Sequence, residues 1–552
     1  MTSADILAQW LAAAEPESAL LERVPRGQPL PTSYAQRGFW FGHQIGGADS
    51  TAFLARHVYR LRGPLDVDAL AAALDALVAR HEILRTTFVE LDAEPWQVVN
   101  EPRSLRLRPE PLPDEAEFDR ALRPPLDLAK GPLFYGRLFR IHDEEHLLLL
   151  VVHHILNDAW SMDVVHRELA ALYEAELTGE PAGLPELGVH YADFAEWQHR
   201  ELGAAAAAEG LEFWRRHLEG APPVLSLRSS RPRPPVQSFE GDWLTFDLDA
   251  PLAAAVSEHA SGARTTQFAV LLGALAVALA RLSGRDDLVI GVPAVHRPLP
   301  ETDEMVGPFM NILPLRFRLA GAASVGAAVE LAASLVREAT AHEAVPFELV
   351  VRELGVPHDP AHNPIVQVLV SSHQGLLEPL ALHGLEVEYV PTWPKDAQRD
   401  LTLVLQSEPE GTIHAAIWYA TDLYDDAAAQ ELADALTTAL HEAVETPAKL
   451  VELEARPPLP QQPPAADEPT PPLDGPAASL VVAAWRDVLG REELDAGSHF
   501  FRLGGTSMSA MRLCARLTET LGAKIPIRAV FECPRLGSFA ARVEELRAAA
   551  GG

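Results

Sequence analysis

An uninterrupted apolar run, Leu147 to Val152, is the clearest strand signal in the sequence. It leads directly into His153 and His154, and polar residues follow at Asn157 and Asp158. A continuous apolar run of this length predicts a strand that is buried on both faces. Because successive strand side chains point to opposite faces, only one of the two histidines can face a given cleft. We therefore expect one histidine to serve chemistry and the other to support the loop that follows the strand.

Helical and strand-like patterns alternate over most of the chain, which predicts an α/β fold. Helices are expected at 164–177, 210–218, 268–282 and 325–340, and strands at 243–248, 288–292, 312–317, 365–371 and 401–406. The economical partition is two α/β lobes, residues 28–185 and 186–450, with a ligand site between them.

The C-terminal hundred residues have a different pattern. Nine prolines lie between Pro457 and Pro476, which predicts an extended linker over 451–476. Three apolar faces at helical spacing follow, so residues 477–548 are expected to form a small all-α four-helix bundle. At the other end, residues 1–27 are expected to be an extension whose short helix at 6–13 packs on the chain or docks on another protein.

Composition and charge limit the classes of partner. The chain has 552 residues and a formal net charge of −33, so nucleic acid and anionic membrane surfaces are poor partners. Its two cysteines, Cys514 and Cys533, give no disulfide scaffold and fit a reducing cytoplasm. No basic segment opens a signal peptide, and the apolar stretch 268–282 falls short of the ~20 residues of a membrane span.

The residues Phe500-Phe501-Arg502-Leu503-Gly504-Gly505-Thr506-Ser507 place a serine after a Gly-Gly turn, at the start of an amphipathic helix. A serine is favoured there as an N-cap whatever its chemistry. On a tethered helical domain, however, this run resembles the peptidyl carrier proteins of nonribosomal peptide synthetases. The resemblance implies that a phosphopantetheinyl transferase attaches 4′-phosphopantetheine to Ser507, where the helix N-terminus favours the phosphate. Thr506 stands where the family often has Asp or His.

The paired histidines have three interpretations. A metal site is not expected, because it needs three or four converging ligands and neighbouring strand residues diverge. A pair of buried structural histidines is the plain alternative. Together with Asp158, however, they resemble the HHxxxD signature of nonribosomal peptide synthetase condensation domains, a branch of the chloramphenicol acetyltransferase-like acyltransferases. Further matching segments follow in family order: Ser33 to Gln36 with Phe39-Trp40, Arg80 to Thr86, Tyr191 to Trp197, Val306 to Asn311, Val345 to Glu348, and Asn363 to Ile365.

This resemblance covers roughly residues 28–450 and implies two acetyltransferase-like lobes arranged in a V. It implies that His154 accepts or positions the proton of the attacking amine, for which an imidazole with a pKa near 6.5 is suited. His153 would face inward, and Asp158 would pair with Arg297 of the second lobe instead of acting as an acid or base. Asn311 would border the substrate channel.

Five positions depart from the family pattern. Ala159 replaces a glycine that commonly follows the aspartate, so a backbone conformation or a close approach to the thioester that glycine permits is expected to change. Gly38 stands where many relatives have Arg, Ile312 where many have Thr, and Glu343-Ala344 where Gln-Asp is common. These departures predict an unusual donor or acceptor pocket.

The resulting hypothesis is an acyltransferase that forms an amide between a thioester on an upstream donor carrier and an aminoacyl acceptor on a carrier, its own Ser507 included. The residues near His81 and Trp160 resemble those of condensation domains that join two L-configured substrates. No adenylation domain fits between the lobes and the carrier, so a separate adenylation enzyme loads it, or the chain is part of a larger assembly. Two alternatives stay open: ester formation or transfer to a free amine or alcohol, and a non-catalytic module that recruits partners.

Overall fold

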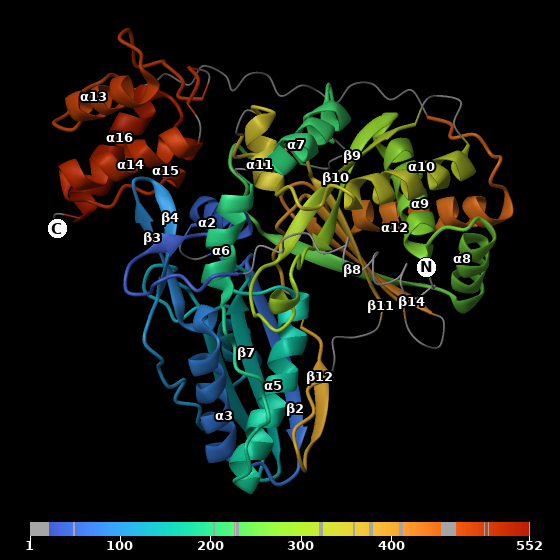
Figure 1. The fold of residues 1–552 in the computed structure, drawn as a ribbon. Coiled ribbons are helices and arrows are strands. Elements are labelled where there is room, and N and C mark those ends of the chain that lie inside the picture. The colour runs from blue at the N-terminus through green and yellow to red at the C-terminus, as the bar shows by residue number, and fades with distance from the viewer. Residues whose placement is uncertain are drawn as a thin grey trace, which may run out of the picture.

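Two α/β lobes and a small helical domain make up the chain (Figure 1). The computed structural model describes residues 21–550 except 48–49, 203–204, 226, 228–230, 320–323, 357–358, 375–378, 393, 408–411, 454–470, 502 and 506. The prediction of two α/β lobes followed by an all-α domain is confirmed. The helix expected at 6–13 and most of the expected linker lie outside the described residues.

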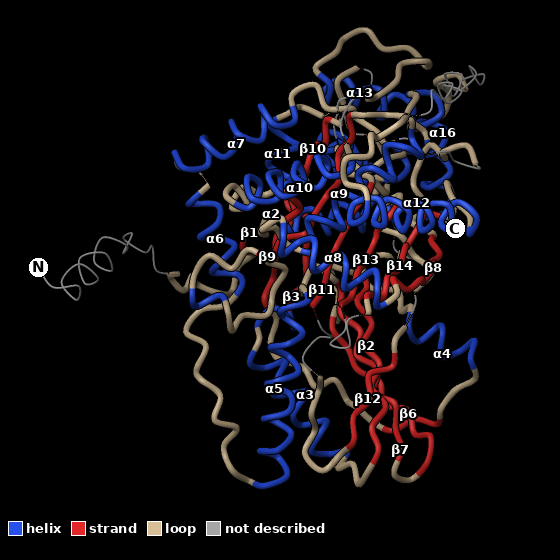
Figure 2. The backbone as a smooth tube through the Cα atoms, turned by 90° about the vertical axis from the view of Figure 1, so that its right-hand side faces the viewer, coloured by secondary structure: helices blue, strands red, loops and turns tan. Residues whose placement is uncertain are grey.

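The first lobe is built on a five-stranded sheet with strand order β12-β2-β7-β6-β5. Its strands are β2 (Leu54–Arg62), β5 (Pro109–Pro111), β6 (Phe134–His142), β7 (Glu145–His153) and β12 (Glu386–Val390). The predicted apolar strand is β7, and its residues from Leu148 to Val152 are fully buried. Helices α3 (Val67–Arg80) and α5 (Ala159–Thr178) pack together on one side of these strands, as Figure 2 shows.

Smaller elements complete this lobe beside the end of β7. Helix α2 (Tyr34–Gly46) begins at a capping box in which Ser33 and Gln36 satisfy each other's backbone N–H groups. The remaining elements are β1 (Leu30–Pro31), η1 (Glu82–Arg85), β3 (Thr86–Leu91), β4 (Glu94–Val99) and α4 (Glu115–Leu122). Strands β1, β4 and β3 form a separate three-stranded sheet.

The second lobe contains a six-stranded sheet with strand order β10-β9-β11-β13-β14-β8. Its strands are β8 (Gly241–Leu248), β9 (Asp287–Val295), β10 (Met310–Arg318), β11 (Val368–Gln374), β13 (Leu401–Ser407) and β14 (Ile413–Ala420). Its helices are α7 (Ala205–Leu218), α8 (Ala250–Gly262), α9 (Gln267–Ser283), α10 (Val325–Thr340), α11 (Phe347–Glu353) and α12 (Asp426–Glu445), with η2 at Pro300–Thr302. The apolar helix α9 is the centre of this lobe's core and packs against α10 and α12.

The lobes exchange chain instead of following one another as two closed units. Strand β12 lies within the sequence range of the second lobe, yet it pairs antiparallel with β2 of the first. The return segment is held by an ion pair from Arg56 to Asp396 at 2.8 Å and by a hydrogen bond from the Gln398 amide to Ala52 O at 2.9 Å. The two lobes are therefore joined by paired strands as well as by packing.

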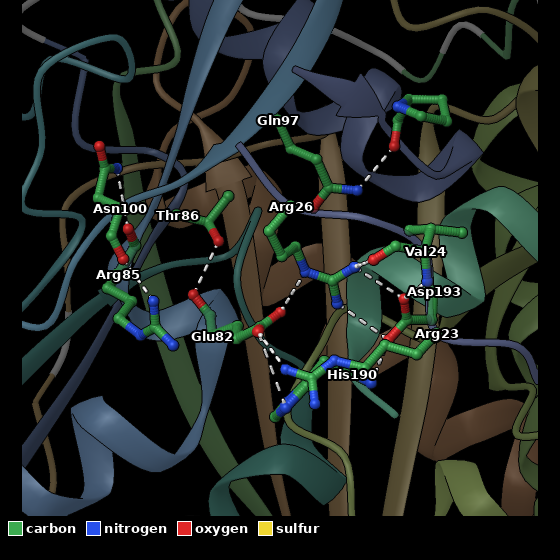
Figure 3. A network of polar contacts seen from close by, with 11 residues as sticks. Arg23, Val24, Arg26, Glu82, Arg85, Thr86, Gln97, Asn100, His190 and Asp193 are labelled. Atoms are coloured by element: carbon green, nitrogen blue, oxygen red, sulfur yellow. Dashed lines mark hydrogen bonds and ion pairs between the residues drawn. The ribbon is translucent and has the colours of Figure 1, made fainter. Parts of the chain in front are cut away.

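A polar network anchors the segment that leads into the first lobe (Figure 3). The Arg26 guanidinium donates to Glu82 at 2.7 Å and to both carboxylate oxygens of Asp193 at 2.8 and 2.9 Å. Asp193 also accepts the backbone N–H groups of Val24 and His190, each at 2.8 Å. Because Asp193 lies on α6 (Tyr191–Glu201), the network fixes that helix to η1.

The C-terminal domain consists of α13 (Ala478–Leu489), α14 (Ser507–Leu521), α15 (Arg528–Glu532) and α16 (Leu536–Ala550). Trp485 is fully buried at its centre, with its ring 5.0 Å from that of Phe500 and 6.1 Å from that of Phe539. The domain lies against the first lobe, where Arg528 donates to Gly46 O at the end of α2, at 3.2 Å (Figure 1).

Among the helices of the described residues, none is by itself long and apolar enough to cross a bilayer. Helices α8 and α9 would reach that length together, but their axes meet at 109°.

Candidate active site

The two histidines at the end of β7 have opposite environments, as their alternation predicts. The backbone N–H of His153 donates to Leu133 O at 2.9 Å, and that of His154 donates to Phe53 O at 2.8 Å. The side chain of His153 is buried, with 1% of the residue exposed, whereas His154 is half-buried. The sheet therefore directs His153 into the core and leaves His154 accessible.

His153 closes the turn that follows the strand. Its Nδ1 accepts the backbone N–H of Ile155 at 3.1 Å, and its Nε2 lies 3.4 Å from His43 Nδ1. Because Nδ1 is an acceptor, the proton of the neutral ring is on Nε2 and points to His43. Burial, together with His43 and His154, holds the pKa of His153 well below its usual range. The structure thus gives His153 an inward, structural position.

His154 stacks on Phe39 of α2, with ring centroids 5.9 Å apart and planes inclined by 19°. Burial lowers the pKa of His154 to about 4, and the positive charge of Arg56 acts in the same direction. The imidazole is therefore neutral at pH 7, in place of the partly protonated ring that an ordinary pKa near 6.5 gives. Within the described chain, no side chain or backbone group hydrogen-bonds to this ring, so a nitrogen is available to accept a proton or a hydrogen bond.

Asp158 is fully engaged by donors from both lobes. It caps α5, where its Oδ1 accepts the Ser161 N–H at 2.8 Å, and its Oδ2 accepts the Phe309 N–H at 3.0 Å. The expected ion pair with Arg297 is present, with Nη2 3.2 Å from Oδ1, and both side chains are almost completely buried. Asp158 is 6% exposed and has no free oxygen toward solvent, so its geometry is structural.

Arg297 is held on the other side by the second lobe. Its Nη1 donates to the carbonyl of Met305 at 2.8 Å and to that of Thr302, and its guanidinium lies over the Phe309 ring at 4.1 Å. Burial lowers the pKa of Arg297, while Asp158 opposes that shift. The pair therefore joins the start of α5 to the loop after β9.

Asn311 fixes the approach to α11. Its side-chain amide donates to Glu343 O and to Val345 O, both at 2.8 Å, and its Oδ1 accepts the Phe347 N–H at 2.9 Å. Asn311 is half-buried on β10. The structure thus gives it a positioning role for residues 343–347, beside its expected place at the channel.

Ala159 is the first residue of α5 and has no left-handed backbone conformation. An ordinary helical residue fits there, so the backbone has no conformation that requires glycine, whereas the expected effect on a close approach to the thioester stays a prediction. Its side chain is exposed.

Three residues at the site were not singled out by the sequence patterns. His43 on α2 backs His153, Phe39 on the same helix stacks on His154, and Tyr191 bonds to Ser33 Oγ and to Pro308 O, each at 2.8 Å. Phe39 and Tyr191 lie inside matched segments, but their contacts depend on how the lobes meet. For His43, the available signal in the sequence was its position three residues after Trp40, one turn further along α2.

The start of α14 is suited to a phosphate group. Ser507 is the first residue of this 15-residue helix, and it follows a turn in which Gly504 has φ +98°. A Cβ at Gly505 would lie 2.4 Å from Phe500 Cδ1, so only glycine fits there. The Ser507 side chain lies outside the described residues. A helix N-terminus attracts a phosphate through its free N–H groups and dipole, so the arrangement fits an attached phosphopantetheine.

Among the described residues, no group of three or more histidine, cysteine, aspartate or glutamate side chains is arranged to hold a metal ion.

Comparison with known proteins assigns both parts of the chain. Residues 27–457 match the condensation domain model, and residues 479–543 match the model of the phosphopantetheine attachment site. The chain is 36% identical over 438 residues to chondramide synthase cmdD of Chondromyces crocatus, covering 77% of this chain and 11% of that protein. It is 36% identical over 439 residues to phosphinothricin tripeptide synthetase PhsC of Streptomyces viridochromogenes, covering 77% and 40%. The chain thus spans less than half the length of these relatives.

Solved structures agree with this assignment. The X-domain from teicoplanin biosynthesis is 30% identical with a TM-score of 0.73, covering 79% of this chain and all of that one. A four-domain nonribosomal peptide synthetase bound to AMP and glycine shares the fold at 19% identity and a TM-score of 0.71, covering 92% of this chain and 40% of that one.

Proposed function

The chain belongs to the condensation-domain family and ends in a phosphopantetheine attachment domain, and from this premise we propose that it is an acyltransferase that joins two carrier-bound substrates through an amide. We assign residues 28–185 and 186–450 to its two lobes, with strand β12 (Glu386–Val390) crossing into the sheet of the first lobe, 451–476 to the linker, 477–548 to the carrier and 1–27 to an extension. The reacting groups are a thioester on an upstream donor carrier and the amine of an aminoacyl acceptor. We take Ser507 as the phosphopantetheine anchor, which places one substrate on the chain itself.

The observation that carries this proposal is a neutral, accessible imidazole at the point where the two lobes meet. In the reaction the amine nitrogen attacks the thioester carbonyl, the new C–N bond forms, and the C–S bond breaks to release the donor's thiol. The amine loses a proton in this step, and His154 is the group placed to accept it or to orient the amine lone pair. The attached phosphopantetheine supplies the thiol that carries the substrate and the length to bring it to the site.

The surrounding residues keep this arrangement in place. Phe39 sets the plane of the His154 ring, His153 fixes the turn, and Asp158 with Arg297 joins the lobes beside it. Tethering both substrates removes much of the entropic cost of their encounter, which is a large part of what such a site needs to supply.

The partners follow from the same assignment. A phosphopantetheinyl transferase modifies Ser507, a separate adenylation enzyme loads the carrier, and an upstream carrier brings the donor. We place the activity in the cytoplasm, since Cys514 and Cys533 are both free thiols.

Intact-mass measurement on the full chain tests this function. The carrier is loaded on Ser507 with an aminoacyl-pantetheine and mixed with a donor-loaded carrier. We expect a mass on this chain equal to donor acyl plus acceptor, and no such mass when Ser507 is changed to alanine. Product that appears only on an added free amine or alcohol would contradict the carrier-bound acceptor and favour the alternative transfer. Absence of product from any acceptor would favour a recruiting module.

A further inference from the structure

Helices α2 and α11 pack against each other at a position where α2 has no side chain, Gly38. A Cβ at this glycine would lie 2.4 Å from Glu348 Oε1 and 3.2 Å from Glu348 Cδ. The carboxylate of Glu348 therefore occupies the space that any larger residue at position 38 would need. We call this arrangement the Gly38–Glu348 contact.

The carboxylate at this contact is enclosed, and its recorded hydrogen bond is with the backbone N–H of Glu348 itself. Burial raises the pKa of Glu348 to about 7, while that N–H, Arg399 and Arg37 act in the opposite direction. Among the described residues, no side chain forms an ion pair within 4 Å or a hydrogen bond with it. A carboxylate in such surroundings is costly unless a cation or several donors reach it. Glu348 is half-buried, so part of the residue is exposed.

The two nearest arginines leave this need unmet. Arg37 is engaged by Glu94 instead. Arg399 is itself enclosed, which lowers its pKa to about 10, and its guanidinium donates to Val366 O at 3.5 Å. Arg399 attracts Glu348 electrostatically, but no ion pair within 4 Å joins the two side chains.

The Gly38–Glu348 contact lies beside the candidate active site. Phe39, the next residue on α2, stacks on His154. On the other side, Asn311 binds the segment that enters α11 through the Phe347 N–H. Both elements that form the contact therefore also carry residues of the site.

We propose that Glu348, given room by Gly38, is the recognition group for a primary ammonium on the acceptor substrate. An ammonium has three donors and a positive charge, and the charge-assisted bond it forms with a carboxylate is among the strong ones in proteins. The group is either the α-amine of the acceptor or an amine on its side chain. This inference rests on the proposed function, because that function makes the ligand an acceptor substrate. The binding of an ammonium group at Glu348 is measurable without catalysis.

Three probes on one scaffold distinguish these sources: pantetheine amides of pentanoate, of 2-aminopentanoate and of 5-aminopentanoate. Their binding to the full chain with an unmodified carrier is measured by titration calorimetry. We expect at least one amine probe to bind roughly tenfold or more tightly than the pentanoyl probe. The 2-amino probe reports the α-amine, and the 5-amino probe reports a side-chain amine.

Two variants test the residue itself. Glu348→Gln is expected to abolish the advantage of the amine probe while pentanoyl binding stays unchanged. Gly38→Arg brings a rival cation to the carboxylate and is expected to have the same effect by a different route. Glu353→Gln, the same change at an exposed position on α11, serves as the matched control and keeps the advantage.

Equal binding of all three probes to the unaltered chain would overturn the proposal, as would an amine preference that survives Glu348→Gln. A preference that depends on Glu348 in a chain that makes no product would refute the proposed function and leave this inference standing. Product formation together with equal binding of all three probes would refute this inference and leave the proposed function standing.

Discussion

Single residues decide what the end of β7 is able to do. His153 and His154 follow each other in the chain, yet one is a buried link in a hydrogen-bonded turn and the other is a stacked ring with an open nitrogen. Asp158, three residues after this turn closes, has donors on both of its oxygens. The chemistry of the motif therefore converges on one side chain, and the others hold it in place.

The ionisation of His154 is directly observable. Because burial and Arg56 both disfavour the imidazolium, its pKa is expected near 4 and not near 6.5. NMR titration of the ring C–H resonances, assigned with the His154→Gln variant, measures the midpoint. A midpoint for His154 at or above 6 would contradict the burial argument.

The ion pair between the lobes should contribute to stability. Changing Arg297 to leucine leaves the buried Asp158 without its cation, for which a loss of about 3 kcal/mol in the free energy of unfolding is expected. Urea denaturation measures this value. The exposed pair of Arg123 with Asp119 provides the control, since Arg123→Leu should change stability by less than about 1 kcal/mol. Equal effects of the two changes would show that Asp158 does not depend on Arg297.

Among the helices and strands, the sequence patterns located those that have a periodic signal within their own residues. Helix α10 has the predicted bounds, and β7 was found from its leucines. Strand β12 was not found, because its residues alternate weakly at an edge and its partner β2 lies over 300 residues away in the chain. Local patterns indicate that a segment is a strand, but not which lobe it joins.

The candidate site also contains some features that local patterns predict and others that depend on tertiary packing. Asp158 with Arg297 followed from matched motifs, and the structure brings them together. The roles of Phe39 and Glu348 depend instead on how α2 meets β7 and α11, which no spacing within one segment encodes. Likewise, the depressed pKa of His154 comes from packing and not from its neighbours in sequence.

The turn before α14 offers a test at this scale. Gly505→Ala would place a methyl group 2.4 Å from Phe500 Cδ1 and 2.7 Å from Phe500 O in the core of the carrier domain. A loss of about 2 kcal/mol in the stability of this domain is expected, with slower attachment of phosphopantetheine to Ser507. Gly497→Ala is the control, because its Cβ meets nothing closer than 3.6 Å. Melting of the domain and the rate of mass gain with a phosphopantetheinyl transferase are the measurements, and identical behaviour of both variants would contradict the packing argument.

For the whole molecule, several buried histidines link folding to pH. Burial lowers the pKa of His43 to about 4 and that of His57 to about 3, so the folded state holds them neutral. Between their unfolded pKa near 6.5 and these values, the unfolded chain binds protons that the folded chain does not. Stability from these groups is complete above pH 6.5 and is lost as the pH falls toward 4.

His57 is suited to isolate this effect, since no described residue hydrogen-bonds to its ring nitrogens. In His57→Leu, the slope of unfolding free energy against pH between about 6 and 4 should decrease by up to about 1.4 kcal/mol per pH unit. Urea denaturation at a series of pH values measures the slope. An unchanged slope would show that His57 does not stay neutral in the folded chain.

The molecule as a whole combines a site between two lobes with a tethered carrier docked on the first of them. Arg528 of the carrier bonds to the end of α2, the same helix that places Phe39 on His154. Carrier, helix and imidazole thus form one continuous arrangement, as the proposed delivery of a carrier-bound amine to His154 requires.

The most direct test of this account is the single-turnover rate of amide formation on Ser507, followed by intact mass, for the unaltered chain, His154→Ala and the control His441→Ala. If His154 accepts the proton of the amine or orients it, His154→Ala is expected to lower the rate by roughly 10² to 10⁴-fold. The control His441→Ala is expected to form product as fast as the unaltered chain. Product formed by His154→Ala at the unaltered rate would contradict the account.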